Sequence, residues 1–239
     1  MATPTIGTVS AVRSQASVST DNVSFTMVAG RYYVVCWAKT AGAGTRSFTA
    51  SDDLGNTWGN YVETATTAAI RSAMHSTLCT VGGSATITVT VSGGTTTFSW
   101  QVIEIIPTSG TLAFGASSTF EDGSSTTSHQ SAASSGFSPP ADSAIVGLGG
   151  GTTGSAFGTA TAGGSYTLQS GASNVFASQT RTTGSLLTDE TVPWTSSTAR
   201  QCKGCAMYVT ETAAAGGGGS IFDGRAFGRG RILGGSALC

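Results

Sequence analysis

Charged residues are scarce in this sequence, and their scarcity narrows the class of protein. They form 10% of the 239 residues, where an ordinary soluble domain has about 25%. Lysine occurs only at Lys39 and Lys203, and the formal net charge is −1, so nothing overall attracts the chain to nucleic acid or to an anionic membrane. The 34 glycines and the many serines and threonines favour short β-strands, polar turns and a neutral surface.

Long hydrophobic runs are also absent. The sequence has no run of about 18 apolar residues, so it predicts no segment that crosses a bilayer. Its first residues, MATPTIGTVSAV, lack the basic start and the apolar core of a signal peptide. We therefore expect synthesis and assembly in a host cytoplasm, without a membrane partner.

Histidine, the commonest general base, occurs only twice. His75 lies in the alternating segment AIRSAMHSTLCTV, where we expect a satisfied or exposed sheet histidine, and His129 lies in a linker rich in Ser and Thr, where we expect it to be solvated. Glu104 is the one acid inside an apolar strand, and we expect it to face solvent at the strand end. A Ser-His-Asp triad stays open because triads assemble from distant positions, but no G-x-S-x-G motif occurs. We predict no catalytic residues and no enzyme.

The five cysteines are an odd number, which leaves at least one thiol free or paired between chains. Cys36 and Cys79 lie in two predicted strands of the first half and could pair, although periodicity does not decide this. The segment CKGC (202–205) has C-x-x-C spacing, but zinc would need a second pair or nearby histidines. We interpret it as two strand or turn thiols, and we predict no metal ion and no cofactor.

Apolar residues recur with a period of two, which indicates half-buried β-strands. The clearest segment is SATITVTV (84–91), and RYYVVCWAK (31–39) and TFSWQVIEI (97–105) are rich in strand-forming residues. Glycine pairs at 82–83, 93–94 and 163–164 predict hairpin turns. The residues predicted for the core of the first half are Tyr33, Val35, Trp37, Ile87, Val89, Val91, Trp100 and Val102.

We therefore predict an all-β chain, with an antiparallel jelly-roll or Ig-like β-sandwich over 1–213. The halves 20–107 and 125–212 echo each other loosely, and VAGRYYVVCWAKTAG (28–42) aligns with PADSAIVGLGGGTTG. This weak similarity indicates either an internal duplication or only the sequence pattern that any two β-rich segments share. The second half has few large apolar side chains, so one sandwich is favoured over two small ones.

The stretch SDDLGNTWGNY (51–61) raises the question of a metal loop. Asp52, Asp53 and Asn56 offer oxygen ligands, but they are out of register with a calcium loop of the EF-hand type. Asp, Gly and Asn also supply the capping oxygens and the left-handed conformations of a tight turn. We predict a hairpin corner that binds no ion, followed by Trp58 at the start of the next strand.

The corner and the strands around it resemble those of a known class of β-sandwich domain. The strand VVCW, the corner SDDLGNTW and the segments ATITVTVSG and FSWQVIEI resemble β-sandwich domains of tailed-phage structural proteins and of some secreted bacterial proteins. The resemblance covers about 20–212 and implies a structural or adhesive module without catalytic residues.

The function expected from this resemblance is that of a virion structural protein, a decoration or spike protein outside the phage head. Its expected partners are the major capsid protein or other virion subunits, and copies of itself. Two alternatives stay open: a carbohydrate-binding or receptor-binding module of a tail fibre, which would read sugars through Trp58, Trp100 or Trp194, and a jelly-roll glycan hydrolase.

The C-terminal segment 214–239 differs from the rest of the chain. Its glycine run is typical of a flexible linker, and it carries a net charge of +2 where the remaining chain carries −3. We expect an extended arm that attaches the protein to a neighbouring subunit, with Cys239 either free or in a disulfide between chains. Three arginines are a weak signal for nucleic acid. The predicted partner-binding residues are Ile221, Phe222, Arg225, Phe227, Arg229, Arg231, Ile232, Leu233 and Leu238.

Overall fold

The computed structural model describes residues 3–41, 46–64, 71–122, 124–133, 135–151, 159–170 and 176–213. The described residues form no helix and 67% of them lie in strands, which confirms the predicted all-β class. Among the described residues, no helix is long and apolar enough to cross a membrane. The predicted arm, 214–239, lies outside the described residues, and so do its partner-binding residues and Cys239.

The described strands fall into two consecutive sets. The first set is β1 (Thr5–Val9), β2 (Arg13–Val18), β3 (Thr20–Met27), β4 (Tyr32–Ala41), β5 (Phe48–Asp52), β6 (Gly59–Glu63), β7 (Arg71–Leu78), β8 (Gly83–Val91) and β9 (Thr96–Ile106). The second set is β10 (Thr111–Glu121), β11 (Thr126–Gln130), β12 (Ser143–Gly151), β13 (Ala160–Ala162), β14 (Thr167–Ser170), β15 (Phe176–Thr183), β16 (Pro193–Arg200) and β17 (Cys202–Thr212).

Each set forms a jelly roll. In the first set the large sheet has the order β1–β9–β4–β7–β6, with β2 also on β9, and the small sheet has the order β3–β8–β5. The first strand thus pairs with the last, and the small sheet pairs the strands that come next inward from each end, as in a jelly roll. The second set repeats this order, with β10–β17–β12–β15–β14 in the large sheet and β11–β16–β13 in the small one.

The two jelly rolls also share an irregularity in their first strands. The register of β1 against β9 shifts between Ile6 and Val9, and that of β10 against β17 shifts between Phe114 and Ser117. In both cases the second-half residue lies 108 positions further along the chain. A β-bulge inserts one extra residue into a strand and bends it. Two bulges at corresponding positions are therefore a more specific similarity between the halves than the strand order alone.

A second pair of bulges gives the same correspondence. The register of β6 against β7 shifts between Asn60 and Val62, and that of β14 against β15 shifts between Leu168 and Ser170, again 108 positions apart. The ladder pairings that start at Ile6 and Phe114 run through β9, β4 and β7 in one half and through β17, β12 and β15 in the other, and they reach β6 and β14 at this same offset of 108. On the strands between, the offset is 104 or 112. This agreement favours an internal duplication over a similarity that any two β-rich segments would show.

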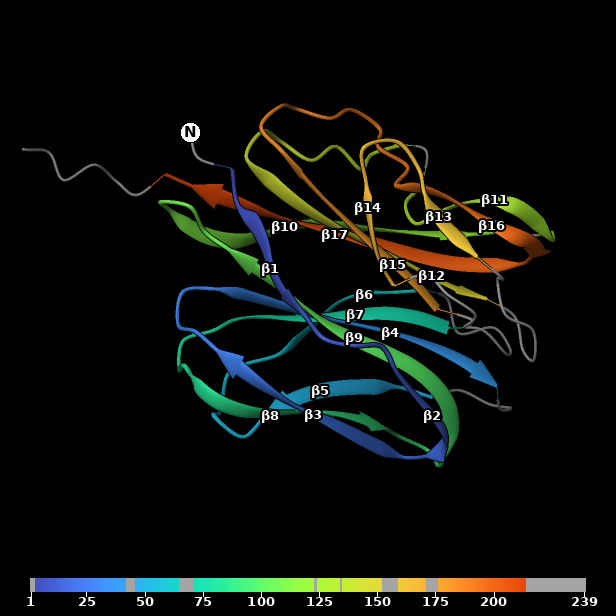
Figure 1. Cartoon of the computed structure of the whole chain (residues 1–239), viewed down its shortest axis with the longest axis horizontal. Helices are drawn as coiled ribbons and strands as arrows, with labels where there is room; N and C mark the ends of the chain where they lie inside the picture. Colours follow the sequence, from blue (N-terminus) through green and yellow to red (C-terminus); the bar gives the residue numbers. More distant parts are fainter. Residues whose placement is uncertain are drawn as a thin grey trace, which may run out of the picture.

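The four sheets stack in four layers, with the two large sheets in the middle and a small sheet on each outer side (Figure 1). On β4, the side chains of Tyr33, Val35 and Trp37 face the small sheet of their own half. Those of Val34 and Cys36 face the large sheet of the second half. The eight residues predicted for the first-half core are all buried in the cluster of Tyr33, as predicted.

The second jelly roll does not rely on its own core alone. Its internal clusters are small, and its apolar residues Val146, Leu148 and Met207 belong to the cluster shared between the two large sheets. The sequence favoured one sandwich over two small ones, whereas the structure has two jelly rolls that share a core. Glycine makes the second roll compact: an added Cβ at Gly149 would lie 2.1 Å from the ring of Trp194, so the indole rests on bare backbone.

Candidate functional site

The corner that follows β5 is saturated by its own hydrogen bonds. Asp52 Oδ1 accepts the backbone N–H groups of Leu54 and Asn56, and Asp52 Oδ2 accepts the indole N–H of Trp58 at 2.6 Å. Gly55 has a φ of 84°, the left-handed conformation that favours glycine in a turn. The predicted tight corner is therefore confirmed, and Trp58 folds back onto it, but the prediction of a hairpin was wrong, because β5 pairs with β8 in the small sheet and β6 pairs with β7 in the large sheet.

The other two polar residues of the corner bind the connection from β7 in the large sheet to β8 in the small sheet, and the start of β8. Asn56 Oδ1 accepts the N–H groups of Thr80 and Val81, and Asp53 Oδ1 accepts the N–H of Thr86 at 2.8 Å. These bonds join the corner to the β7–β8 connection. In the part of the chain that the structure describes, no group of three or more His, Cys, Asp or Glu residues is placed to hold a metal ion.

Glu104 is buried, so the expectation that it faces solvent was wrong. Its side chain is 2% exposed, and its carboxylate accepts hydrogen bonds from Thr8 N–H, Arg31 and the hydroxyl of Tyr33. Burial alone would raise the pKa of Glu104, but these donors outweigh it and hold the pKa below its usual value. The carboxylate joins β1 to β4 and β9, and its oxygens are occupied by the protein itself.

Glu211, which the sequence reasoning did not single out, holds the connection between the jelly rolls. Its carboxylate accepts the backbone N–H groups of Thr108, Ser109 and Gly110. Burial opposes ionisation of this group, but the three N–H donors prevail and lower the pKa of Glu211. No sequence signal pointed to this role, because an acid near a strand end is more often a surface residue.

Two of the three tryptophans proposed as a sugar platform are buried. Trp100 is fully enclosed and Trp194 is 2% exposed, whereas Trp58 is half-buried. The indole of Trp100 donates to Asp21 Oδ2 at 2.7 Å. Trp100 is therefore buried, as the core prediction had it, and the alternative of exposed, sugar-reading rings was wrong for Trp100 and Trp194.

The two histidines occupy buried positions with polar partners. His75 Nδ1 accepts the indole N–H of Trp37 at 3.2 Å, and burial lowers the pKa of His75 to about 4, so this ring is neutral. It is the satisfied sheet histidine that we expected. His129 was expected to be solvated, but it is 3% exposed, because its linker forms β11 of the outer small sheet.

His129 lies between an acid and a serine. Its Nδ1 is 3.0 Å from Asp122 Oδ2, and its Nε2 is 2.9 Å from Ser196 Oγ. This is the constellation of a Ser-His-Asp triad, which the sequence left open. The three residues come from β11, from β16 and from the position after β10, so their proximity depends on the pairing of the small sheet.

The surroundings of this triad favour a structural role. Ser196 Oγ also donates to the carbonyl of Thr198 at 2.8 Å, the ring of Trp194 covers His129 at 4.3 Å between centroids, and the imidazole has no solvent exposure. A nucleophile must be able to reach its substrate and needs donors aimed at the developing oxyanion. We therefore interpret the triad as a polar clasp between β10, β11 and β16.

The described cysteines are all free and buried. Cys36 faces the second jelly roll and Cys79 faces the small sheet of the first, so the suggested pairing between them does not form. Cys202 and Cys205 lie three residues apart on β17 and point to opposite faces, in agreement with two strand thiols. Burial raises the pKa of each of these thiols, which suppresses the reactive thiolate.

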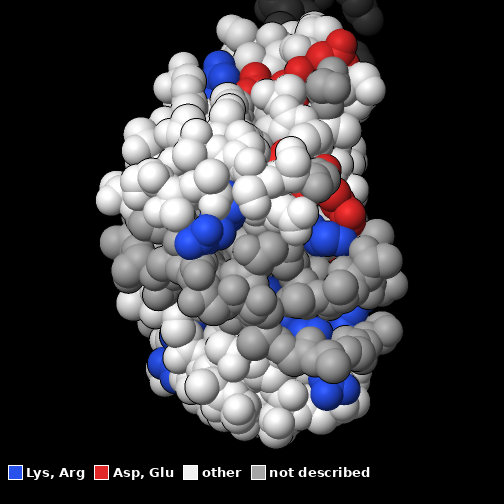
Figure 2. Space-filling model, turned by 90° about the vertical axis from the view of Figure 1, so that its right-hand side faces the viewer, with Lys and Arg blue, Asp and Glu red and all other residues white. Residues whose placement is uncertain are grey.

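Charged side chains are sparse on the surface. On the face shown in Figure 2, acidic groups gather toward the second jelly roll and basic groups lie scattered among neutral residues. Some charged side chains of the described residues form ion pairs, such as Lys203 Nζ with Glu121 Oε2 at 2.9 Å.

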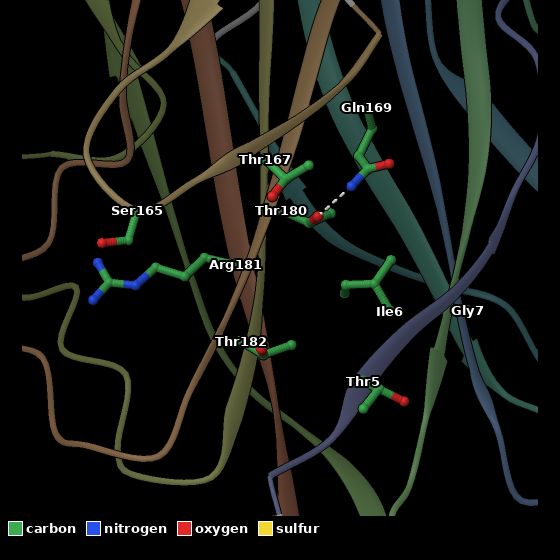
Figure 3. Close-up of a pocket in the computed structure, with 9 residues that line it drawn as sticks. All are labelled: Thr5, Ile6, Gly7, Ser165, Thr167, Gln169, Thr180, Arg181 and Thr182. Atoms are coloured by element: carbon green, nitrogen blue, oxygen red, sulfur yellow. Dashed lines mark hydrogen bonds between the residues drawn. The ribbon is translucent and has the colours of Figure 1, made fainter.

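A cleft opens where the two jelly rolls meet at the β1 edge (Figure 3). Its volume is about 450 Å³. Side chains from β1, from β15 and from the segment around β14 line it, and they are mainly hydroxyls. The lining residues are Thr5, Ile6, Gly7, Ser165, Thr167, Gln169, Thr180, Arg181 and Thr182.

Comparisons of the sequence and the structure with known proteins found no matching family model, no matching curated protein and no matching solved structure.

Proposed function

We propose that this chain is a structural subunit of a viral particle, a decoration or spike protein of a tailed-phage head. The double jelly roll would be the exposed body, and residues 214–239 would attach it to the major capsid protein or to other virion subunits. The observation that carries the proposal is a four-layer β body in which the described ionisable groups bind other groups of the same chain. Jelly rolls are frequent in viral capsid and lectin domains.

The use of the ionisable groups supports a structural role over catalysis. The carboxylates of Asp52, Glu104 and Glu211 each accept several hydrogen bonds from the chain, and His129 lies inside a covered clasp. Active sites leave such groups open to a substrate and shift their pKa values toward neutrality, whereas here the pKa values of Glu104 and Glu211 move down.

The composition of the described surface supports attachment through the arm. Only Val28, Val81 and Leu186 are exposed large hydrophobic residues among those described, so the body has no broad apolar patch there. The arm combines Phe222, Phe227 and other apolar side chains with three arginines. Burying each such side chain is worth roughly 1.5–3 kcal/mol, which offsets much of the cost of ordering a glycine-rich segment.

Deletion of 214–239 tests this function. We expect the truncated protein to keep its β circular dichroism and melting temperature and to be lost from particles purified on a density gradient. A variant with a Gly-Ser segment of equal length controls for chain length, and it should also be lost. Normal incorporation of either variant, or absence of the full chain from purified particles, would contradict the proposal.

A further inference from the structure

The duplication creates two equivalent seams between the large sheets. At one seam β10 of the second jelly roll lies beside β6 of the first, and at the other β1 of the first lies beside β15 of the second. A perfectly repeated sequence would fill both seams in the same way. Differences between them therefore show where one copy has been changed.

Apolar side chains of both halves pack against the core shared by the large sheets. Phe114 and Leu78 do so with large groups, and Ile6 and Val9 of β1 do so at the other seam. In the register set by the matching bulges, Ile6 is the counterpart of Phe114, and Thr182 is the counterpart of Leu78. The seam at β1 has thus exchanged a phenyl ring and a leucine for smaller groups, and the cleft of about 450 Å³ opens there.

The lining of the cleft selects a neutral, hydroxyl-rich ligand. Among the described residues that line it there is no Asp or Glu, so this lining offers no negative charge to a cation. Arg181, the charged residue of the described lining, has Glu190 at 3.6 Å and the ring of Tyr166 at 5.6 Å, and its guanidinium points away from Ile6 and Thr180 (Figure 3). An anion would have to compete with Glu190 for that group.

The hydroxyls are available for such a ligand. Gln169 Nε2 donates to Thr180 Oγ1 at 2.6 Å, which fixes the amide against the cleft wall (Figure 3). Among the described residues, the hydroxyls of Thr5, Thr167 and Thr182 make no side-chain hydrogen bond, and all three residues are exposed. Each hydroxyl both donates and accepts, which suits the hydroxyls of a sugar, and Ile6 offers an apolar contact for a ring face.

We propose that the cleft at β1 binds a neutral saccharide of one or two rings. Its volume lies within the range of small-molecule sites, roughly 300–1,000 Å³. The site is distinct from any tryptophan platform, because Trp58, Trp100 and Trp194 do not line it. The inference goes beyond the structural role proposed above, since a subunit that only assembles needs no ligand.

Saturation-transfer NMR and titration calorimetry on the full chain test this site. The probes are glucose, galactose, mannose, N-acetylglucosamine, rhamnose, lactose and maltose, and at least one should bind. Thr182→Leu introduces the leucine of the counterpart position, Leu78, and should weaken that binding about tenfold or more. Thr167→Val removes one hydroxyl at constant shape and should weaken it several-fold, while leaving the strand intact.

Thr195→Leu is the matched control, because Thr195 is exposed on β16 and does not line the cleft. It should bind like the unmodified chain. The proposal is overturned if none of the seven sugars binds, if both cleft variants bind normally, or if Trp58→Ala abolishes binding while Thr182→Leu does not.

Discussion

The two jelly rolls have one strand order and pack it by different means. In the first, large rings fill the space between the sheets, as where Trp37 stacks on Phe48 at 3.6 Å between centroids. In the second, glycines on β12 remove side chains so that Trp194 and Val192 rest directly on the backbone. The comparison teaches that the space between two sheets can be filled by large side chains or reduced by glycines that lack a side chain. The two rolls should therefore fail under opposite kinds of substitution.

Removal of bulk should do most damage in the first roll. Trp37→Ala deletes a fully buried indole, its stacking on Phe48 and its bond to His75, and we expect a loss of about 3–5 kcal/mol in the free energy of unfolding. Urea unfolding monitored by circular dichroism measures it. Trp58→Ala, which removes a half-buried indole of the same roll, is the comparison, and an equal loss from both would contradict the argument.

Addition of bulk should do more damage in the second roll. Gly149→Ala places a methyl group against the ring of Trp194, and we expect a loss of about 1–3 kcal/mol from this overpacking. The same methyl group at Gly184 meets only Thr3 Oγ1, at 3.2 Å, so Gly184→Ala should be nearly neutral. Both values come from the same unfolding experiment, and a neutral Gly149→Ala would show that the two rolls are packed alike.

The smallest effect is expected at the clasp of the second roll. Ser196→Ala removes the hydrogen bonds to His129 and to the Thr198 carbonyl and should lower stability by about 1 kcal/mol, whereas exposed Ser24→Ala should leave it unchanged. A fluorophosphonate probe, which labels activated serines, should not label the unmodified protein. Labelling at Ser196 would replace the structural interpretation with a catalytic one.

Much of the first jelly roll could be predicted from the local pattern of the sequence. The period of two placed Tyr33, Val35 and Trp37 on an inward face, and the side-chain chemistry of Asp52 and Asn56 predicted the corner. Such features depend on neighbours within a few residues or on one adjacent sheet. They are therefore visible in a single sequence.

Other features depended on partners far away in the chain. Glu104 looked like a strand-end acid because its donors Thr8 and Arg31 are distant in sequence. His129 and Ser196 are 67 residues apart and meet only through the pairing of β11 with β16. The cleft at β1 was invisible for the same reason, since it requires two jelly rolls docked in a particular register.

The core shared by the two large sheets has a consequence during synthesis. The side chains of Val34, Cys36 and Ile103 are covered only when Val146, Met207 and their neighbours have been made. A ribosome-bound chain that ends before β12 would expose this apolar layer while its other face is already complete, and such surfaces promote aggregation. During translation the first jelly roll therefore keeps one apolar face exposed until the second jelly roll has been synthesised and packs against it.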